Sequence, residues 1–298
     1  MTKIDNLKQS AGSASMGSDS EWKLFSKYQT EWETNARFDA KWAVLSLVDR
    51  LGGWDEQTFF RIGVGEVNEV FAFLERNRIE LPMLKTCLDF GCGIGRVTQA
   101  LASRFEKVVG IDISKSMLEQ ANSYRLKAAN TTYVLSETPE LERTLGWNRF
   151  DLIYSNITLQ HLDRTLQKQY IRQFARILTS NGLAIFQIPS QGPRGAPTSV
   201  FARKILLGLS SIRSRSFLSL ISNSFRSWIP PWRVRMELNI LPEAEVESVA
   251  AKEGLELLTK AYVDWDRFYR THEFVLAEKP DRLSGQFPRS TVYFFRGS

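Results

Sequence analysis

A glycine-rich turn and an acid downstream of it form the strongest chemical signal in this sequence. Residues 88–96 read LDFGCGIGR, and they lie between a short apolar stretch and a helical one. Such a turn lets backbone N–H groups approach a ligand closely, and the start of the following helix favours an anionic group. Asp112 ends the next apolar stretch, 23 residues beyond Asp89. A carboxylate at that place can accept hydrogen bonds from both hydroxyls of a ribose.

The glycine spacing separates several kinds of nucleotide site. A dinucleotide fingerprint, Gly-x-Gly-x-x-Gly, would need a glycine at position 96, where the chain has Arg96. The pattern found is Gly-x-Gly-x-Gly, and no P-loop lysine follows it. The turn therefore predicts a nucleoside ligand rather than a dinucleotide or a nucleoside triphosphate.

The turn belongs to an alternation of strands and helices. Nearly all-apolar strands are predicted at 86–90, 107–112, 131–136, 150–156 and 183–189, with amphipathic helices between them. The clearest helix spans 164–178, and Asn181-Gly182 is its predicted stop. This order predicts a parallel sheet covered on both faces, an α/β fold. A helix at about 243–253 and two strands near 255–265 and 271–278 bring the sheet to seven strands.

At these residues the chain resembles the class I S-adenosylmethionine-dependent methyltransferases. Residues 150–162, FDLIYSNITLQHL, resemble the family's fourth strand and the loop beyond it, and residues 178–189 resemble its helix stop and fifth strand. The resemblance covers about 86–189 and the two later strands. It implies a Rossmann-like sheet and S-adenosyl-L-methionine as the cofactor.

The resemblance also implies roles for single residues. Those implied around the amino-acid moiety of the cofactor are Asp89, Gly91, Cys92, Gly93 and Arg96. Those implied for the remainder are Asp112 on the ribose, Ile113 and Met117 flanking the adenine, and Asn156 or Ser155 near the sulfonium. Many members carry an acid or asparagine after the third strand to bind the adenine amino group. This chain has Ser136-Glu137-Thr138 there, so Glu137 is a candidate for this contact but not the favoured interpretation.

Transfer of a methyl group to a hydroxyl needs alignment, exclusion of water and a base. His161 follows the fourth strand, at the carboxyl edge where open α/β sheets bind ligands. We therefore predict His161 as the catalytic base and Gln160 as a substrate contact. The alternative is a histidine that hydrogen-bonds a loop or orients Gln160. His272 is predicted to be structural.

Other chemistries leave no pattern in the sequence. The loop at 155–158 reads Ser-Asn-Ile-Thr, not the Asn/Asp-Pro-Pro-aromatic motif of enzymes that methylate nucleobase amines. Cys87 lies in a predicted buried strand and Cys92 in the turn, so neither suits a nucleophile. With these two cysteines and two histidines the chain predicts no disulfide scaffold, no Cys/His zinc cluster and no metal site.

Two additions to the α/β pattern are expected to select the acceptor. Residues 21–85 are helical and aromatic, and Trp54 and Phe60 are predicted to contact substrate, the alternative being that the aromatics pack as core. Residues 190–240 carry eight basic residues and one acid, so they hold the whole excess of the +6 net charge. This insertion is predicted to be a helical lid hinged at Pro230-Pro231. Peripheral contact of 200–235 with an anionic membrane ranks second, and nucleic acid third.

Composition and pattern together divide the chain into four parts. Its 298 residues, 43% hydrophobic and 24% charged, are typical of one large or two small globular domains. We expect a leader at 1–20, a helical cap at 21–85, the cofactor-binding domain at 86–280 with its insertion at 190–240, and a tail at 281–298. Neither a signal peptide nor a membrane span is predicted, so a cytoplasmic location is expected.

The predicted function is transfer of a methyl group from S-adenosylmethionine to a small-molecule hydroxyl. Oxygen is only modestly preferred over nitrogen or carbon as the methylated atom. The alternatives are an RNA methyltransferase and a module that binds cofactor or partner without catalysis.

Overall fold

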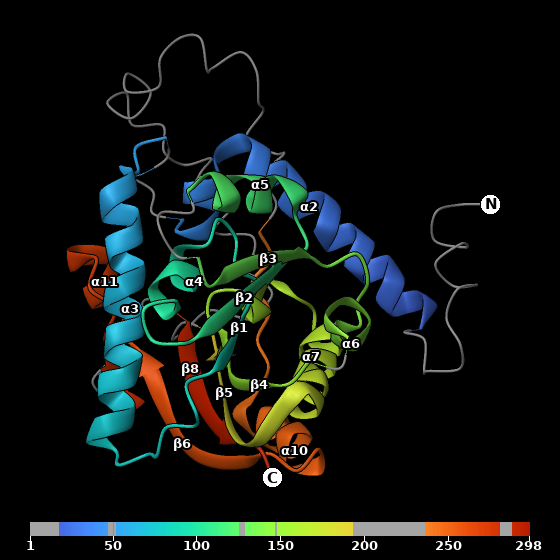
Figure 1. The fold of residues 1–298 in the computed structure, drawn as a ribbon, viewed down its shortest axis with the longest axis vertical. Helices are drawn as coiled ribbons and strands as arrows, with labels where there is room; N and C mark the ends of the chain where they lie inside the picture. The colour runs from blue at the N-terminus through green and yellow to red at the C-terminus, as the bar shows by residue number, and fades with distance from the viewer. Residues whose placement is uncertain are drawn as a thin grey trace.

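A computed structural model describes residues 18–46, 50, 52–124, 129–146, 148–192, 236–280 and 288–298. It shows a mixed sheet with helices on both faces (Figure 1). The strand order is β3-β2-β1-β4-β5-β8-β6-β7. The predicted α/β fold is therefore confirmed, with eight strands in the described sheet in place of seven.

The first five strands form the parallel part of the sheet. Their bounds are β1 Thr86–Phe90, β2 Lys107–Asp112, β3 Thr131–Leu135, β4 Phe150–Ser155 and β5 Leu178–Gln191. Four of the five begin and end within one residue of the prediction; β1, β2 and β4 are apolar runs that the sheet buries, whereas only the first residue of β3 is buried. The fifth begins earlier than predicted: α7 (Arg164–Ile177) ends before Leu178, and Asn181 bends β5 at φ +61° instead of stopping the helix.

The eighth strand comes from the segment that the sequence pattern treats as a tail. β8 (Arg289–Arg296) lies between β5 and β6 (Glu256–Val263) and runs antiparallel to both. Its residues 290–295 are all buried, which accounts for the apolar run there. By contrast, the strand predicted at 271–278 is reduced to β7 (Leu276–Ala277): Thr271 ends α11 (Trp265–Thr271), and residues 272–275 are neither helix nor strand.

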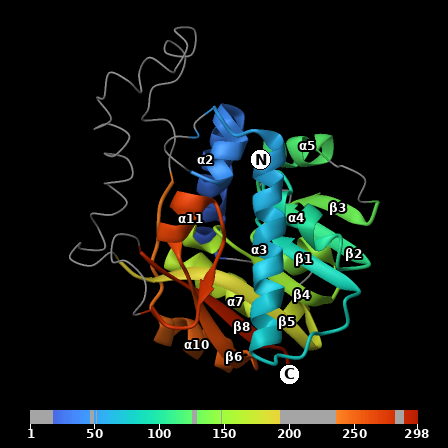
Figure 2. The ribbon, with the colours of Figure 1, turned by 90° about the vertical axis from the view of Figure 1, so that its left-hand side faces the viewer.

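The helices form two layers, one on each face of the sheet, and the view of Figure 2 looks past one layer onto a face of the sheet. On one face lie α3 (Glu56–Arg76) and α4 (Arg96–Leu101), which pack on the sheet through one apolar cluster. On the other lie α6 (Leu141–Leu145), α7 and α10 (Glu243–Lys252), which share a second cluster. α5 (Lys115–Ser123) follows β2.

Helix α2 (Asp19–Val44) belongs to both clusters, because Tyr28 joins the second and Ala36 to Ala43 the first. It therefore crosses above the carboxyl ends of the strands (Figure 1). Ser18 and Glu21 form a capping box at its start, and non-helical backbone at Asp39 bends it near its end. The helical cap predicted from sequence thus supplies a roof, α2, and a side wall, α3.

The predicted lid, 190–240, lies mostly outside the described residues. The segment 200–235, with Pro230-Pro231, lies wholly outside them. The chain is described again from Met236, and 236–241 run against the loop after β4: the Asn239 N–H donates to the Gln160 carbonyl at 2.7 Å, and the Leu241 N–H to that of Pro189 at 3.0 Å.

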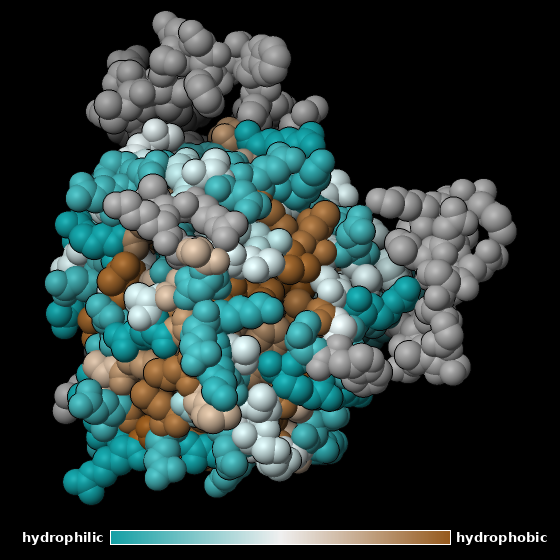
Figure 3. All heavy atoms as spheres, viewed as in Figure 1, coloured by the Kyte–Doolittle hydropathy of each residue, from teal (hydrophilic) through white to brown (hydrophobic). Residues whose placement is uncertain are grey.

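The surface seen from the side of Figure 1 is polar over most of its area (Figure 3). Hydrophobic side chains reach the surface in a band below α2, on the side of α6 and α7. Among the described helices, none combines the length and the apolar character needed to cross a bilayer.

Candidate active site

A cavity lies beneath α2 at the carboxyl ends of β1, β2 and β4. It encloses about 990 Å³ of space free of protein atoms, the solvent at its mouth included. Helix α2 contributes Phe25, Tyr28, Trp32, Ala43 and Val44 to its wall. The sheet and its loops contribute Asp89–Gly93, Arg96, Val97, Ile111–Ile113, Met117, Ser136, Asn156–Thr158, Leu162, Leu166 and Tyr170. All nine residues predicted to bind the cofactor are among these.

The glycine turn has the tight geometry that its sequence predicts. Gly91 has φ +74°, and a side chain there would overlap Thr158 from the loop after β4, so both conformation and space require glycine. Its N–H groups, however, are used within the protein. Those of Gly91 and Cys92 donate to the Ile111 carbonyl at 2.8 and 3.0 Å, and that of Gly93 donates to Asp112 at 2.8 Å. The turn therefore shapes the cavity floor instead of offering these donors to a ligand.

Asp112 stands in the middle of the cavity wall, at the end of β2. Its two carboxylate oxygens accept from the backbone N–H groups of Gly93 (2.8 Å) and Ser114 (2.9 Å). Burial raises the pKa of Asp112, although these hydrogen bonds oppose the shift. The side chain is thus fixed in place, and each carboxylate oxygen has a second lone pair with which to accept from a ligand.

One end of the cavity carries opposite charges. Arg96 is 3% exposed, and its Nη2 lies 2.8 Å from Glu66 of α3. Glu66 also accepts from the Tyr154 hydroxyl at 2.8 Å. The Nε and Nη1 atoms of Arg96 are buried and have no hydrogen-bond partner among the described residues. Nearby, burial raises the pKa of Asp89 to about 7, against a 2.6 Å hydrogen bond from Thr98.

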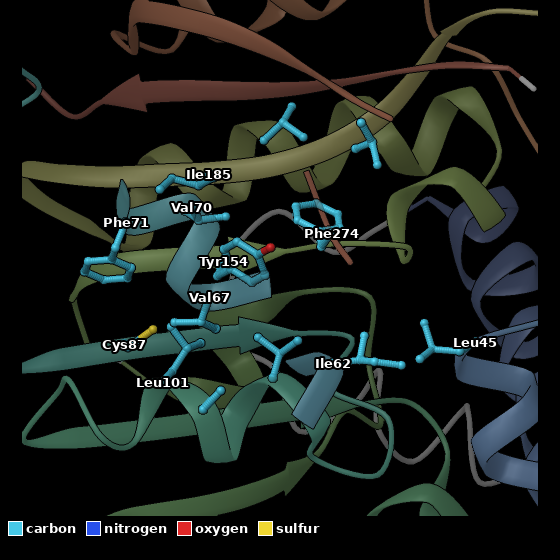
Figure 4. Close-up of a cluster of buried hydrophobic side chains, with 14 of the residues drawn as sticks. Leu45, Ile62, Val67, Val70, Phe71, Cys87, Leu101, Tyr154, Ile185 and Phe274 are labelled. Carbon is cyan, nitrogen blue, oxygen red and sulfur yellow. The ribbon is translucent and has the colours of Figure 1, made fainter. Parts of the chain in front are cut away.

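Sequence reasoning missed Glu66, which lies on the wall helix α3. Figure 4 shows how that helix packs: Val67, Val70 and Phe71 point toward the strand residues Cys87 and Tyr154. The only signal in the sequence is that Glu66 is a carboxylate within an apolar helical stripe. In the structure its side chain is 1% exposed. A buried carboxylate predicts a cationic partner, but the sequence does not identify that partner.

Another part of the cavity lining is apolar. It includes Phe25 and Tyr28 of α2 together with Leu162, Leu166 and Tyr170. The Tyr170 ring packs on Phe90 with ring centroids 4.6 Å apart. No sequence motif marks these residues, because they come from α2 and from residues 162–170, far apart in the chain.

The roof helix is pinned on both sides of the cavity. Glu33 accepts hydrogen bonds from the Ser114 hydroxyl (2.8 Å) and from the Ser116 N–H (3.0 Å) at the start of α5. Burial opposes ionisation of Glu33, but these bonds prevail and lower its pKa to about 2. On the other side Glu237 contacts Lys27 (2.7 Å) and the Tyr28 hydroxyl (3.2 Å).

His161 is buried in a short 3-10 helix, η2 (Leu159–His161), and is not among the residues that line the cavity. Its Nδ1 lies 2.8 Å from the Glu237 carbonyl, which can only accept, so Nδ1 carries the proton. Its Nε2 is 3.2 Å from the Gln160 amide nitrogen. Burial lowers the pKa of His161 to about 4, against the Glu237 bond, so the ring is neutral at pH 7.

The three predicted substrate contacts also lie behind the cavity wall. Gln160 is buried and accepts from Gln187 at 3.2 Å. Trp54 is buried, donates to the Leu45 carbonyl at 3.0 Å and packs on His272. Phe60 contacts Phe59 and Tyr124. Their roles in substrate binding stay predictions.

Comparison with known proteins agrees with the geometry. Residues 87–182 match a family described as a methyltransferase domain. The solved structure of magnesium protoporphyrin IX methyltransferase from Synechocystis PCC 6803, with bound SAH, has a TM-score of 0.55 to this chain. The two sequences are 17% identical. The superposition covers 92% of this chain and 99% of that protein. Residues 87–182 thus match a methyltransferase domain, and the solved structure shows the same fold. The nine cavity residues named from the sequence all lie within that domain.

Curated relatives of the methyltransferase domain differ in their acceptors. Ubiquinone biosynthesis O-methyltransferase from Nitrosomonas europaea is 26% identical over 125 residues, which are 42% of this chain and 52% of that protein. Trans-aconitate 2-methyltransferase from Variovorax paradoxus is 34% identical over 134 residues, 43% of this chain and 47% of that protein. The chain thus spans about half the length of the curated relatives that it matches.

Proposed function

We propose that this chain transfers a methyl group from S-adenosyl-L-methionine to the hydroxyl of a small-molecule acceptor. The observation that carries the proposal is a cavity under α2 whose lining combines the charged side chains of Asp89 and Arg96, the Asp112 carboxylate, and aromatic and aliphatic side chains from α2 and from residues 162–170. This combination of groups suits an amino acid, a ribose and a base in one extended molecule.

The residues present fit that cofactor. Two buried nitrogens of Arg96 have no partner among the described residues and suit the carboxylate of the amino-acid moiety, and Asp89 beside them suits the ammonium. The Asn156 amide, directly after β4, is likewise buried and has no partner in the described part of the chain. S-adenosylmethionine supplies an activated methyl group on a sulfonium. The chain's own residues would hold the molecule, orient it and exclude water.

Oxygen as the methylated atom is supported by the names of two relatives. One is an O-methyltransferase of ubiquinone biosynthesis, and another is a malonyl-[acyl-carrier protein] O-methyltransferase from Anoxybacillus flavithermus, 34% identical over 104 residues. The acceptor would approach the methyl group beside Asn156 and Thr158, where the cavity meets the loop after β4.

The proposal is tested first by calorimetric titration with S-adenosylhomocysteine, with NADH and FAD as controls. We expect selective binding of S-adenosylhomocysteine and a rise in melting temperature, since a ligand at 100 times its Kd stabilises a fold by about 2.7 kcal/mol. Methyl transfer is then measured with radiolabelled cofactor against a panel of phenols, carboxylic acids and amines. Absence of binding in ligand-free protein would overturn the proposal.

His161 is proposed as the base for the acceptor hydroxyl. To act, it must exchange the Gln160 contact at Nε2 for the acceptor, while Nδ1 stays bonded to Glu237. We expect His161→Gln to lower kcat by about 10²-fold or more while S-adenosylhomocysteine affinity stays within about threefold. Because His161 ionises at a pKa of about 4, the rate should show no histidine limb between pH 5.5 and 8. If His161→Gln kept the wild-type kcat, His161 would not be the base, and only its contact with Glu237 would remain as its role.

A further inference from the structure

Gln187 is a polar side chain in the middle of a buried strand. Residues 182–190 of β5 are all buried, and Gln187 is 1% exposed. An amide in such a place costs free energy unless its donors and its acceptor are bonded. Its Oε1 accepts from the Ile157 N–H at 3.1 Å, and its Nε2 donates to Oε1 of Gln160 at 3.2 Å. Gln187 therefore fastens the loop after β4 to the neighbouring strand.

We propose that Gln187 is a positioning residue for the methyl transfer. Through Gln160 it keeps Nε2 of His161 as a hydrogen-bond acceptor, the form in which this nitrogen can take a proton from a hydroxyl. The inference rests on the proposed function, in which His161 is the base. It adds a residue that does not line the cavity and reaches His161 through Gln160.

The direction of the hydrogen bonds is fixed at the Ile157 end. A backbone N–H can only donate, so the atom of Gln187 that faces Ile157 is its carbonyl oxygen. The NH2 group of Gln187 then faces Gln160, and the atom of Gln160 that accepts is its carbonyl oxygen. The NH2 group of Gln160 is left to face Nε2 of His161 at 3.2 Å, so this ring nitrogen is the acceptor.

The other end of this series gives the same direction. Nδ1 of His161 lies 2.8 Å from the Glu237 carbonyl, which can only accept, so Nδ1 carries the proton. The four hydrogen bonds from Ile157 to Glu237 thus run one way. We call these four bonds the Gln187 relay.

A second proton on His161 would meet a donor instead of an acceptor. Protonated Nε2 would point at the NH2 group of Gln160, and Gln160 cannot turn its carbonyl toward the ring without releasing Gln187. This effect acts in the same direction as burial, which lowers the pKa of His161 to about 4. The lone pair of Nε2 therefore stays available at neutral pH.

The ionisable groups on the elements around the imidazole ring have other partners. On α2, Trp32 packs edge-on to the ring with centroids 5.0 Å apart, and Lys27 and the Tyr28 hydroxyl contact the Glu237 carboxylate. Asp163 caps the start of α7. Among the described residues, the hydrogen bonds that reach the two ring nitrogens are those of the Gln187 relay.

The first donor of the relay belongs to a strained turn that lines the cavity. Ile157 has φ +58°, a left-handed conformation that a β-branched residue rarely adopts. Such strain persists only where the surroundings impose it, and it is concentrated at functional sites. Gln187 holds the N–H of this residue, and residues 156–158 line the cavity. One side chain thus fixes both the cavity loop and the histidine that follows it.

The test is an NMR titration of the full chain with 15N-labelled histidine. The chain has two histidines, His161 and His272, and His161→Gln assigns their signals. In the wild type we expect a His161 ring that is protonated at Nδ1 alone and neutral down to about pH 5. Gln187→Met keeps the length of the side chain and removes both of its hydrogen bonds. Gln160 can then turn its carbonyl toward a protonated Nε2, so the pKa of His161 should rise to about 5 or 6.

Gln173→Met is the matched control. Gln173 on α7 is also buried, accepts from the Leu141 N–H at 2.5 Å and donates to the Pro139 carbonyl at 3.0 Å, but it is not part of the relay and does not line the cavity. This variant should lower the melting temperature about as much as Gln187→Met, because it loses the same kinds of bond. The pKa of His161 should stay at its wild-type value.

Two further measurements show whether Gln187 acts through Gln160. In the double variant Gln187→Met/Gln160→Met no carbonyl is left to turn toward Nε2, so the pKa of His161 should return to within about 0.5 of the wild-type value. In the wild type itself, the side-chain NH2 groups of Gln160 and Gln187 should exchange slowly with water, a measurement that needs no variant to fold.

The same variant has an expected effect on the reaction. With an acceptor found in the panel, kcat of Gln187→Met should fall as the pH drops below about 6, because His161 is then protonated. The wild type and Gln173→Met should show no such fall above pH 5.5.

The outcomes separate this inference from the function on which it rests. An unchanged pKa of His161 in Gln187→Met, or fast exchange of both NH2 groups in the wild type, would overturn the role of Gln187 whatever the reaction is. A raised pKa with a flat pH–rate profile would overturn His161 as the base, and the place of Gln187 in the reaction with it. Failure of the proposed function is seen separately, as absence of S-adenosylhomocysteine binding by the wild type. A pKa raised in Gln187→Met alone, with a fall in kcat below pH 6, supports the proposal.

Discussion

Asp112→Ala is expected to weaken S-adenosylhomocysteine binding by one to two orders of magnitude. Hydrogen bonds to a charged group contribute about 1.5 to 3 kcal/mol each, and every 1.4 kcal/mol is tenfold in Kd. The substitution also removes the acceptor for the Gly93 and Ser114 N–H groups, so the turn that shapes the cavity floor loosens at the same time. Calorimetry gives the affinity, and thermal unfolding gives the stability.

A matched control separates the two effects. Asp151 in β4 is also buried and accepts from the Thr86 N–H (2.9 Å) and the Thr179 hydroxyl (3.2 Å), but it does not line the cavity. Asp151→Ala should lose stability with the Kd for S-adenosylhomocysteine within about twofold of wild type. If Asp112→Ala also bound as tightly as wild type, the ribose would have to lie elsewhere.

Gly63→Ala is expected to destabilise the protein by up to about 2 kcal/mol. A methyl group at Gly63 would overlap the backbone carbonyl oxygen of Arg96 and lie 2.9 Å from its Cγ, because α3 and α4 pack backbone to backbone here. Helix propensity favours alanine by about 1 kcal/mol, but overpacking costs about 1 to 3 kcal/mol and backbone cannot rotate away. The displaced Arg96 should also weaken S-adenosylhomocysteine binding.

Gly65→Ala, on the same helix, is the control of opposite sign. Gly65 is exposed, and a methyl group there would meet no atom within 4 Å. Only the helix propensity then changes, so we expect a gain of up to about 1 kcal/mol and an unchanged Kd. Urea unfolding of the wild type, Gly63→Ala and Gly65→Ala measures the three stabilities. If the two variants were equally stable, α3 would not contact α4 at Gly63 as closely as in the structure.

The cap is more than a covering for the domain. Glu66 from α3 fixes Arg96 at the charged end, while Glu33 and Lys27 from α2 hold the roof on both sides. The aromatic, helical composition of residues 21–85 predicts such a cap and names Trp54 and Phe60 as substrate contacts. In the structure these two side chains pack behind the cavity wall. Their packing agrees with the alternative prediction, that most of these aromatic residues form core.

What the sequence determines on its own is the part of the site that a single βαβ unit builds. Glycines at 91, 93 and 95 follow one strand, and Asp112 ends the next, so parallel pairing of β1 with β2 brings them together without help from distant residues. Local periodicity decides these strands, because each is buried on both faces and reads as an apolar run. The nine cofactor residues predicted in this way all line one cavity.

Only the tertiary structure decides which distant elements complete that cavity. Glu66 meets Arg96 across 30 residues, and Phe25 and Tyr170, more than a hundred residues apart, line one cavity. The apolar run at 292–295 becomes part of β8 because it pairs with β5 on one side and with β6 on the other. His161 likewise finds its partner in Glu237, near the end of the insertion at 190–240. Periodicity tells which face of an element is buried, but the partner of that face is set by packing of the whole chain.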